Sequence, residues 1–497
     1  MSVDKQIIRL IGAALDPNEA TQIQFAANVN AVIAPFSPGV IRDQFLPFIV
    51  TWIPKNNKTI TLHIATHLIE IVKAAGGLAP VSPLIEALIS SEDPKTLDQI
   101  ASSLSSYQGD PMIDELITRL LLSAFDPVRA FIPQLLPIAS SDSSRLRFCQ
   151  TMVRDKAFLV RFALAEYLPK LSLNDMQVIA QSLIQDPQSR IRAYLPVVCT
   201  PIPSFFKDIA TPLLSDHDWS VRASLATQVV KAQDHEQAAL IATKLIGDGV
   251  WQVKLCALQS LTKLLKEESS IKYDQGLTVL SVLSDLIKFP QFSLRTAVID
   301  CFFAIAMHAG GSIPIDKLKP FVDDLVANQP PNVKLHFLNA IAATKKREFA
   351  ALIETKIGSI VDALSRDDKW RVRLGVVQEL HPLADLMPGS NCPAEFATLC
   401  LRLTEDEAYP VRIASINHLA LQFVSEGTSI PACVLQMKAK DSFRRRQTAL
   451  QILAEMRKHT SDSSFKDQLL NEMKNFQGDA CKNVSLLANK LVEEATN

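Results

Sequence analysis

The chain has 497 residues, a formal net charge of −1 at neutral pH, 6% aromatic residues and only 15 glycines. Its abundant Leu, Ile, Val and Ala favour helices and argue against a β-sandwich or barrel. Because the charges balance, no overall field attracts nucleic acid or an anionic membrane, and we expect neither as a partner. The mean hydropathy of +0.14 is high. Since no apolar run approaches the ~20 residues of a membrane span, this value indicates many buried helix faces.

A short phrase recurs along the chain: an acidic residue, a few further residues, an aliphatic residue, then Arg or Lys and an apolar stretch. It reads Asp-Lys-Ala-Phe-Leu-Val-Arg at 155–161 and Asp-His-Asp-Trp-Ser-Val-Arg at 216–222. We call the Arg or Lys the basic position of a repeat. In chain order it is occupied by Arg129, Arg161, Arg192, Arg222, Lys254, Arg295, Lys334, Arg373, Arg412 and Arg446. A fixed phrase at a steady period predicts a solenoid of stacked helix pairs.

Weaker copies of the phrase extend the series in both directions. Three precede it, with Gln24, Thr61 and Asp98 at the equivalent position, and one follows it with Ser485 there. The spacing fits two helices of ~12 residues and two short turns. The predicted fold is therefore all-α, an α-α superhelix of about fourteen two-helix repeats. It forms a single continuous array over residues 1–497.

The eleventh repeat illustrates the predicted unit. Asp367 and Asp368 fall in the turn between its two helices, where a carboxylate can accept the free N–H groups of the second helix. Apolar residues then recur at helical spacing and predict a buried stripe. They are Val372, Val376, Val377, Leu380 and Leu383 in the second helix, and Phe396, Leu399 and Leu403 in the next one.

Two interpretations of the basic position remain open at this stage. The residue falls in the first turn of the second helix, and stacking brings equivalent turns together. An Arg of one repeat can then reach the Asp of its neighbour, which would give a structural ladder of partly buried ion pairs. Alternatively, some of these arginines face a binding partner.

The turns inside the repeats form a ridge along one edge of the predicted solenoid, and such edges commonly bind partners. Large side chains occupy nearly the same place in the ridge of several repeats: Trp219, Trp251, Trp370, Tyr409 and Phe443. Aromatic residues and Arg at exposed turns are typical of interface hot spots. The other interpretation is that these rings pack on neighbouring turns.

The thirteenth repeat adds a basic run around Phe443. It comprises Lys438, Lys440, Arg444, Arg445 and Arg446, with Asp441 as the one acid between them. Such a run is usually a solvated face. Beside an aromatic ring it could also dock an acidic protein surface.

Nothing in the sequence indicates catalysis, a metal site or a cofactor. His63 and His67 lie four residues apart but lack the glutamate of a zinc-protease motif, and no glycine-rich phosphate loop is present. The eight scattered cysteines form no Cys-x-x-Cys pair. They are typical of reduced, mostly buried thiols, with zinc or disulfides as the other possibility. Since the N-terminus also lacks a secretory pattern, we expect a cytoplasmic or nuclear, non-enzymatic protein.

The clearest phrases resemble those of a known family. Asp-Asp-Lys-Trp-Arg-Val-Arg-Leu at 367–374 is similar to the eleventh repeat of the HEAT-repeat scaffolding subunit of serine/threonine protein phosphatase 2A. Segments 408–412, 441–446 and 218–222 resemble its twelfth, thirteenth and seventh repeats. The resemblance spans the chain but is specific mainly at repeats eleven to thirteen. The family has fifteen repeats, whereas fourteen are counted here.

The resemblance implies two binding regions. Residues 361–497, repeats eleven to fourteen, would bind a phosphatase catalytic subunit. Residues 1–360, repeats one to ten, would bind a regulatory B-type subunit. The matching catalytic-side residues are Trp370, Arg371, Tyr409, Phe443 and Arg444, and the matching regulatory-side residues are Arg161 and Trp219.

The function expected from this resemblance is a non-enzymatic scaffold that binds both partners on one flexible solenoid and raises their effective concentration. The alternative is another HEAT-repeat adaptor, such as a nuclear transport receptor. Receptors of that class tend to be longer and more acidic than this chain.

Overall fold

The computed structural model contains helices and no strands over the residues that it describes. These residues are 12–53, 57–200, 202–267, 273–308, 320–325, 329–344, 354–386, 392–438 and 442–496. Lys440 and Asp441 of the basic run lie outside them. Among the described helices, none combines the length and the apolarity that a membrane crossing requires.

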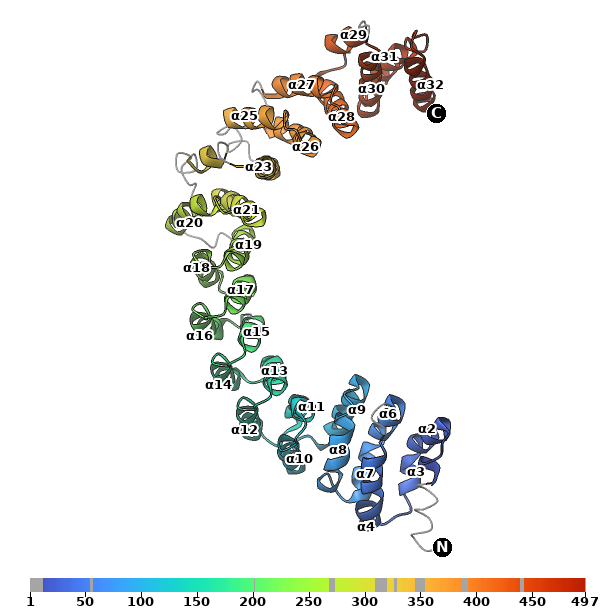
Figure 1. The fold of residues 1–497 in the computed structure, drawn as a ribbon, viewed down its shortest axis with the longest axis vertical. Coiled ribbons are helices and arrows are strands. Elements are labelled where there is room, and N and C mark those ends of the chain that lie inside the picture. Colours follow the sequence, from blue (N-terminus) through green and yellow to red (C-terminus); the bar gives the residue numbers. More distant parts are fainter. Residues whose placement is uncertain are drawn as a thin grey trace. The chain divides into compact units, whose positions relative to one another are not determined.

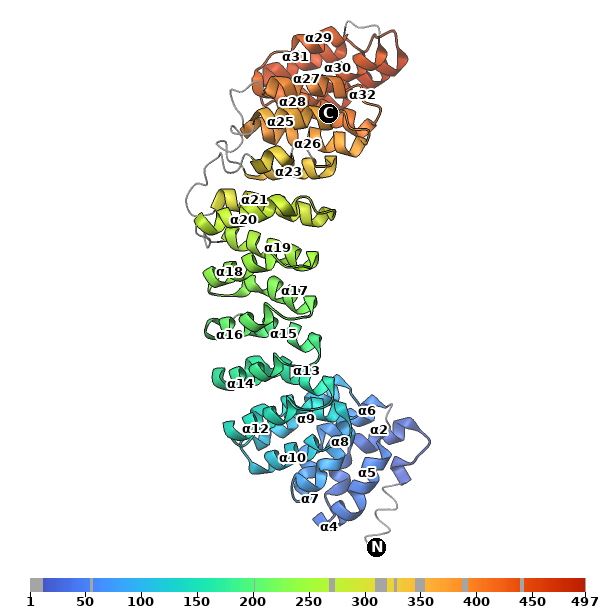
Figure 2. The ribbon, with the colours of Figure 1, turned by 60° about the vertical axis from the view of Figure 1, so that its left-hand side comes forward.

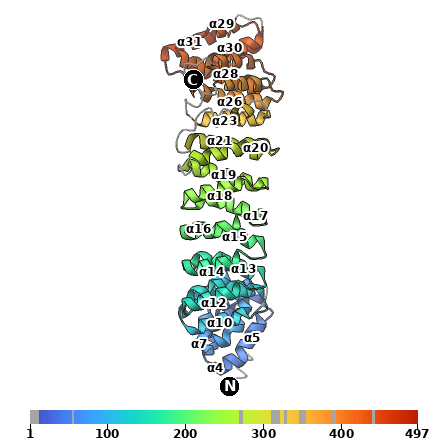
Figure 3. The ribbon, with the colours of Figure 1, turned by 90° about the vertical axis from the view of Figure 1, so that its left-hand side faces the viewer.

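The chain divides into two compact units, Met1–Ile241 and Ala242–Asn497, with the boundary inside helix α18 (His235–Ile246). In each unit, short antiparallel helix pairs follow one another in chain order, as Figure 1 shows and the two rotated views repeat (Figures 2 and 3). The division follows packing within the chain. The predicted division of binding regions at residue 360 concerns partners and stays a prediction.

In the first unit, the first helices of successive repeats lie in one layer and the second helices in another (Figure 1). The first helices are α4 (Pro38–Val40) with π-helix η1 (Ile41–Phe45) and α5 (Leu46–Trp52), α8 (Ser82–Ile89), α10 (Pro111–Leu121), α12 (Asp142–Met152), α14 (Leu173–Leu183) and α16 (Pro203–Leu213). The second helices are α2 (Glu19–Ala27) with α3 (Val29–Ile33), α6 (Lys58–Thr66) with α7 (Leu68–Ala75), α9 (Pro94–Leu104), α11 (Asp126–Phe131), α13 (Phe158–Tyr167), α15 (Ser189–Cys199) and α17 (Trp219–Gln228).

The second unit repeats this arrangement with longer second helices. Its first helices are α20 (Tyr273–Leu286), α25 (Glu354–Leu364), α27 (Cys392–Leu403), α29 (Ala432–Lys438) and α31 (Ser463–Lys474). Its second helices are α19 (Trp251–Glu267), α21 (Phe292–His308), α23 (Pro331–Thr344), α26 (Trp370–Leu386), α28 (Tyr409–Glu426), α30 (Phe443–His459) and α32 (Lys482–Thr496). Each second helix packs on the next one, which makes this layer a continuous core.

Hydrophobic periodicity explains why these segments are helices and which face each one buries. All five stripe residues predicted in α26 are buried, as are the three predicted in α27. Side chains three and four positions apart project from one helix face, so each helix buries one stripe against its neighbours. The all-α class and the two-helix repeat are thereby confirmed.

The cysteines contribute to this core. Four of the seven described cysteines are buried, and none of the seven is in a disulfide. Burial raises the pKa of the Cys149, Cys199 and Cys301 thiols to about 12. These thiols therefore stay protonated and behave as small apolar side chains.

Candidate functional site

The basic position has the same place in every clear repeat. It lies three residues after the first residue of the second helix: Arg161 in α13, which begins at Phe158, and Arg373 in α26, which begins at Trp370. The side chain therefore points back over the turn that precedes the helix. This register follows from the sequence phrase and confirms the predicted start of each second helix.

Arg161 shows what the basic position does. Its Nε and Nη2 donate to the two carboxylate oxygens of Asp186 in the next repeat, at 2.6 and 3.2 Å. Its Nη1 donates to the backbone oxygen of Asp155, in its own turn, at 2.8 Å. Arg161 and Asp186 are both buried. One guanidinium thus binds both the turn of its own repeat and the turn of the next repeat.

The same pairing recurs in both units. Within Met1–Ile241 the pairs are Arg129–Asp155, Arg161–Asp186 and Arg192–Asp216; within Ala242–Asn497 they are Arg373–Asp406 and Arg446–Asp479. In each pair the acid lies six residues before the basic position of its own repeat. We call these five pairs the ladder. The structural interpretation of the basic position is confirmed at these five interfaces.

The ladder carboxylates also accept hydrogen bonds from backbone N–H groups. Asp186 Oδ1 also accepts the N–H of Gln188 at 2.9 Å, and Asp406 Oδ1 accepts the N–H of Ala408 at 2.8 Å. Burial opposes the ionisation of Asp406, but the hydrogen bonds from Arg373 and Ala408 outweigh it and lower the pKa of this carboxyl. The hydrogen bond from Arg446 is the main cause that lowers the pKa of Asp479. The carboxylates of Asp406 and Asp479 are therefore ionised at neutral pH.

Two repeats of the second unit depart from this pattern. Phe289 stands where the ninth repeat would carry its acid, and Lys254 Nζ lies 5.6 Å from the centre of the Phe289 ring. Burial lowers the pKa of Lys254. At the following interface, between the ninth and tenth repeats, Arg295 Nη1 contacts the amide oxygen of Gln329 at 3.4 Å. A cation–π contact and a neutral acceptor thus replace two carboxylates.

The first residue of the second helix forms the exposed ridge. The Tyr409 side chain is 62% exposed, Trp219 46% and Phe443 41%, whereas Trp251 and Trp370 are half-buried. The exposed rings support the interpretation of the ridge as a binding surface more than that of mutual packing. Phe292, 47% exposed, occupies the same position in the ninth repeat. Sequence reasoning missed it, although its place three residues before Arg295 was a sufficient signal.

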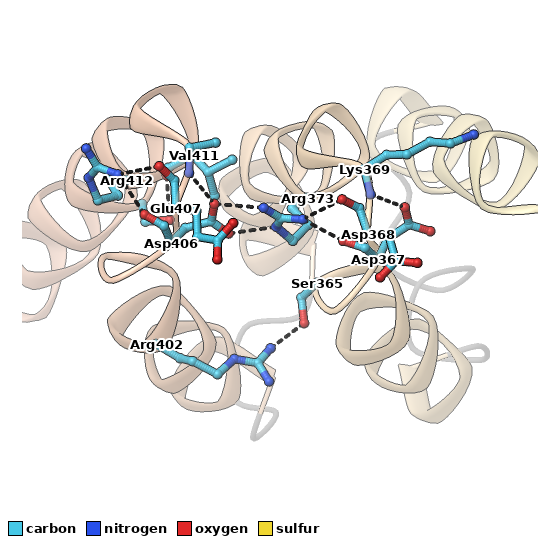
Figure 4. Close-up of polar contacts among 12 residues, drawn as sticks. Ser365, Asp367, Asp368, Lys369, Arg373, Arg402, Asp406, Glu407, Val411 and Arg412 are labelled. Carbon is cyan, nitrogen blue, oxygen red and sulfur yellow. Dashed lines mark hydrogen bonds and ion pairs between the residues drawn. The ribbon is translucent and has the colours of Figure 1, made fainter.

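Arginines lie over two of the ridge rings. Arg371 Cζ is 4.7 Å from the centre of the Trp370 ring, and Arg412 Cζ is 5.6 Å from that of Tyr409. Arg371 is itself exposed. Such contacts hold an aromatic ring in place while its outer face stays accessible. In the close-up, Arg373 lies between Asp406 on one side and Asp367 and Asp368 on the other (Figure 4).

Most described cations of the basic run have acidic partners within the chain. Lys438 pairs with Glu472 at 2.7 Å and Arg445 with Glu405 at 2.6 Å, while Arg446 belongs to the ladder. Arg444 is exposed. The described part of the run is therefore largely neutralised, which weakens the hypothesis of a general dock for acidic surfaces.

The predicted site residues lie one or two to a repeat and do not converge on a pocket. Arg161 and Trp219 belong to the first unit, and the five catalytic-side residues to the second. The burial of Arg161 in the ladder favours its structural role over a contact with a partner. No cluster of metal-binding side chains occurs among the described residues. An extended row of side chains can bind a protein surface, but it offers no enclosed site for chemistry.

A buried histidine in α28 makes the second unit sensitive to acid. Burial, with a smaller contribution from nearby His381, lowers the pKa of His418 from 6.5 to about 4. Between pH 6.5 and 4, His418 is protonated in the unfolded chain but neutral in the folded chain. The free energy of unfolding therefore falls as the pH drops from 6.5 to 4. We expect a loss of up to about 3 kcal/mol over this range.

Hydrogen exchange of α28 as a function of pH checks this expectation. His418→Leu should flatten the pH dependence between 6.5 and 4, whereas His459→Leu at the exposed end of α30 should leave it unchanged. Hydrogen bonds from their arginine partners lower the pKa of four ladder carboxyls, so the contribution of these four is lost only at lower pH; they are Asp155, Asp216, Asp406 and Asp479. An unchanged slope in His418→Leu would contradict the assignment.

Comparison with known proteins supports the fold. No protein-family model and no curated protein matches the sequence. A solved structure of Kap121p bound to Ste12p matches with 13% identity and a TM-score of 0.51, over 99% of this chain and 56% of that one. Kap95p, in a structure with RanGDP described for nuclear import complex assembly, matches with 13% identity and a TM-score of 0.46, over 100% and 66%. Importin beta matches with 12% identity and a TM-score of 0.44, over 99% and 66%.

These likenesses bear on the fold alone, and the Kap121p structure is the one of the three that is similar enough to indicate it. This chain spans only 56% of Kap121p and about two thirds of the other two proteins. Together with the helix pairs and the ladder, the comparison identifies an all-α solenoid of HEAT-type repeats.

Proposed function

We propose that this chain is a non-enzymatic adaptor that binds protein partners along the ridge. The observation that carries the proposal is the row of exposed aromatic residues at the starts of the second helices, above all Tyr409 and Phe443. Large exposed rings at a regular spacing are unfavourable in water and are enriched at the centres of protein interfaces.

The ladder explains how such a surface would work. In four of the five pairs, the guanidinium fixes its own turn through a backbone oxygen and the next turn through a carboxylate, as Arg373 does with Asp367 and Asp406. The ridge residues are thus held before a partner arrives. Preorganisation lowers the entropy lost on binding, so a shallow, extended surface can bind tightly. Several sites on one chain would also raise the effective concentration of two partners.

Two classes of adaptor are supported by different observations. The fold shared with Kap121p supports the transport-receptor alternative better than the phosphatase scaffold. The phrase at 367–374 favours the scaffold, with a phosphatase catalytic subunit on residues 361–497 and a regulatory B-type subunit on 1–360. In either case we propose that the ridge of repeats eleven to thirteen is the centre of the binding surface. We also propose that the protein acts in the cytoplasm or the nucleus.

Affinity capture from the native cell, with the full chain as bait, separates the two classes. The bound proteins are identified by mass spectrometry and assayed for phosphatase activity, with a Tyr409→Ala chain as the matched control. Phosphatase subunits lost from the control would support the scaffold, and small GTPases or transport cargo lost from it would support the receptor. A set of bound proteins identical for both baits would contradict ridge binding.

A further inference from the structure

Besides Lys254 and Arg295, a third basic position of the second unit lacks a ladder acid. The carboxylate that binds each ladder arginine comes from the residue six before the basic position of the next repeat. For Arg412 the next basic position is Arg446, and the residue six before it is Lys440. A lysine cannot accept hydrogen bonds from a guanidinium. The sequence therefore places no acid at the ladder position for Arg412; the next residue, Asp441, lies outside the described residues.

The geometry of Arg412 agrees with this. Its Nη1 donates to the backbone oxygens of Asp406 at 2.7 Å and Glu407 at 2.9 Å, as Nη1 of Arg373 does to Asp367 and Asp368 (Figure 4). Arg373 also holds a carboxylate with its Nε and Nη2. Over the part of the chain that the structure describes, the corresponding edge of Arg412 has no carboxylate partner.

The surroundings of this edge fit a protein ligand. Arg412 is half-buried and lies over the ring of Tyr409, the most exposed aromatic residue of the ridge. Phe443 and Arg444, at the start of the following second helix, are also exposed. A partially desolvated guanidinium edge binds a carboxylate in two parallel hydrogen bonds, and the neighbouring rings favour an apolar residue beside it.

We propose that Arg412 is a docking site for an aspartate or glutamate side chain of a protein partner, whose neighbouring apolar residue packs on Tyr409. The partner carboxylate completes the ladder between the twelfth and thirteenth repeats. This inference rests on the proposed function, because it supplies the chemistry of the partner residue that the ridge recognises.

Peptide selection on the intact chain tests the inference without a known partner. The probe is a phage-displayed library of random peptides, and each selected peptide is then measured by calorimetry. Selected peptides should carry Asp or Glu next to an apolar residue, and Arg412→Gln should weaken them about tenfold or more, the effect of one charge-assisted pair. The matched control Lys458→Gln removes an equal charge from the exposed C-terminal turn of α30, the end opposite Phe443, and should change affinity by less than about threefold.

One further variant separates the possible outcomes. Lys440→Asp restores the acid by the register of the other repeats, so it should block the peptides as strongly as Arg412→Gln while Arg412 stays in place. This variant also guards against misfolding of Arg412→Gln. Peptides that depend on Tyr409 but bind equally to Arg412→Gln would overturn the inference and leave ridge binding intact. A library that yields no Arg412-dependent peptide, or equal losses in Arg412→Gln and Lys458→Gln, would also overturn it.

Discussion

Replacing Asp186 by alanine should destabilise the first unit by about 3–5 kcal/mol, because it leaves the Arg161 guanidinium buried without a counter-charge. Asp186 is only 5% exposed, and it serves Arg161 through both oxygens and the N–H of Gln188 through one. The substitution therefore removes three hydrogen bonds and one ion pair from the joint between two repeats. No surface substitution should approach this effect.

Hydrogen exchange resolved by helix is the appropriate measurement, because long repeat arrays need not unfold in a single step. Protection should fall in α13 and α15, on both sides of the broken pair. The matched control is Asp362→Ala, which removes an exposed pair with Arg366 and should cost at most about 1 kcal/mol.

A double variant tests the physical reason. Arg161→Met with Asp186→Leu removes both charges, and we expect most of the lost stability to return, since paired apolar groups need no desolvation. Equal protection in Asp186→Ala and the unchanged protein would show that the ladder contributes little to the joint. A double variant as unstable as the single one would attribute the loss to packing rather than to the uncompensated charge.

Replacing Trp370 or Tyr409 by alanine should each weaken partner binding by about 2 kcal/mol or more, which is about 30-fold in Kd. The two rings start adjacent second helices of the second unit, and each has an arginine over its face. Tyr409 is largely exposed, so its loss should leave the fold unchanged. Trp370 is half-buried, and its variant needs a check of stability alongside the affinity.

The affinity is measured by calorimetry with a partner recovered by capture on the full chain. Phe292→Ala supplies the matched control, because Phe292 has the same place in the ninth repeat and a similar exposure to Phe443. It lies outside residues 361–497, where we propose the catalytic-side ridge. Unchanged affinity in a folded Tyr409→Ala chain would assign the ring to the solvent. Equal losses in all three variants would extend the interface beyond the eleventh repeat.

Local sequence was sufficient for the repeat and for the start of each second helix. The phrase around Arg161 or Arg373 contains the turn, the cap and the first apolar residues of the stripe, and all of these act within a few residues. The ladder was also predictable in kind, because stacked repeats must place equivalent turns side by side. Phe292 could have been found in the same way, from its place relative to Arg295.

Only the tertiary structure decided which of these side chains reach solvent and which are neutralised. Arg445 pairs with Glu405, forty residues away, and Arg161 is buried against the next repeat. Neither the local composition nor the local charge therefore reveals whether these two arginines are exposed or paired. The same holds for Arg412, whose identity matches the ladder arginines but whose outer edge has no carboxylate partner among the described residues. The periodic sequence pattern determines which residue occupies each position of a repeat, because that pattern depends only on residues close together in the chain. The exposure of a side chain and its ion-pair partner depend on the neighbouring repeat, because packing brings together residues that are distant in the chain.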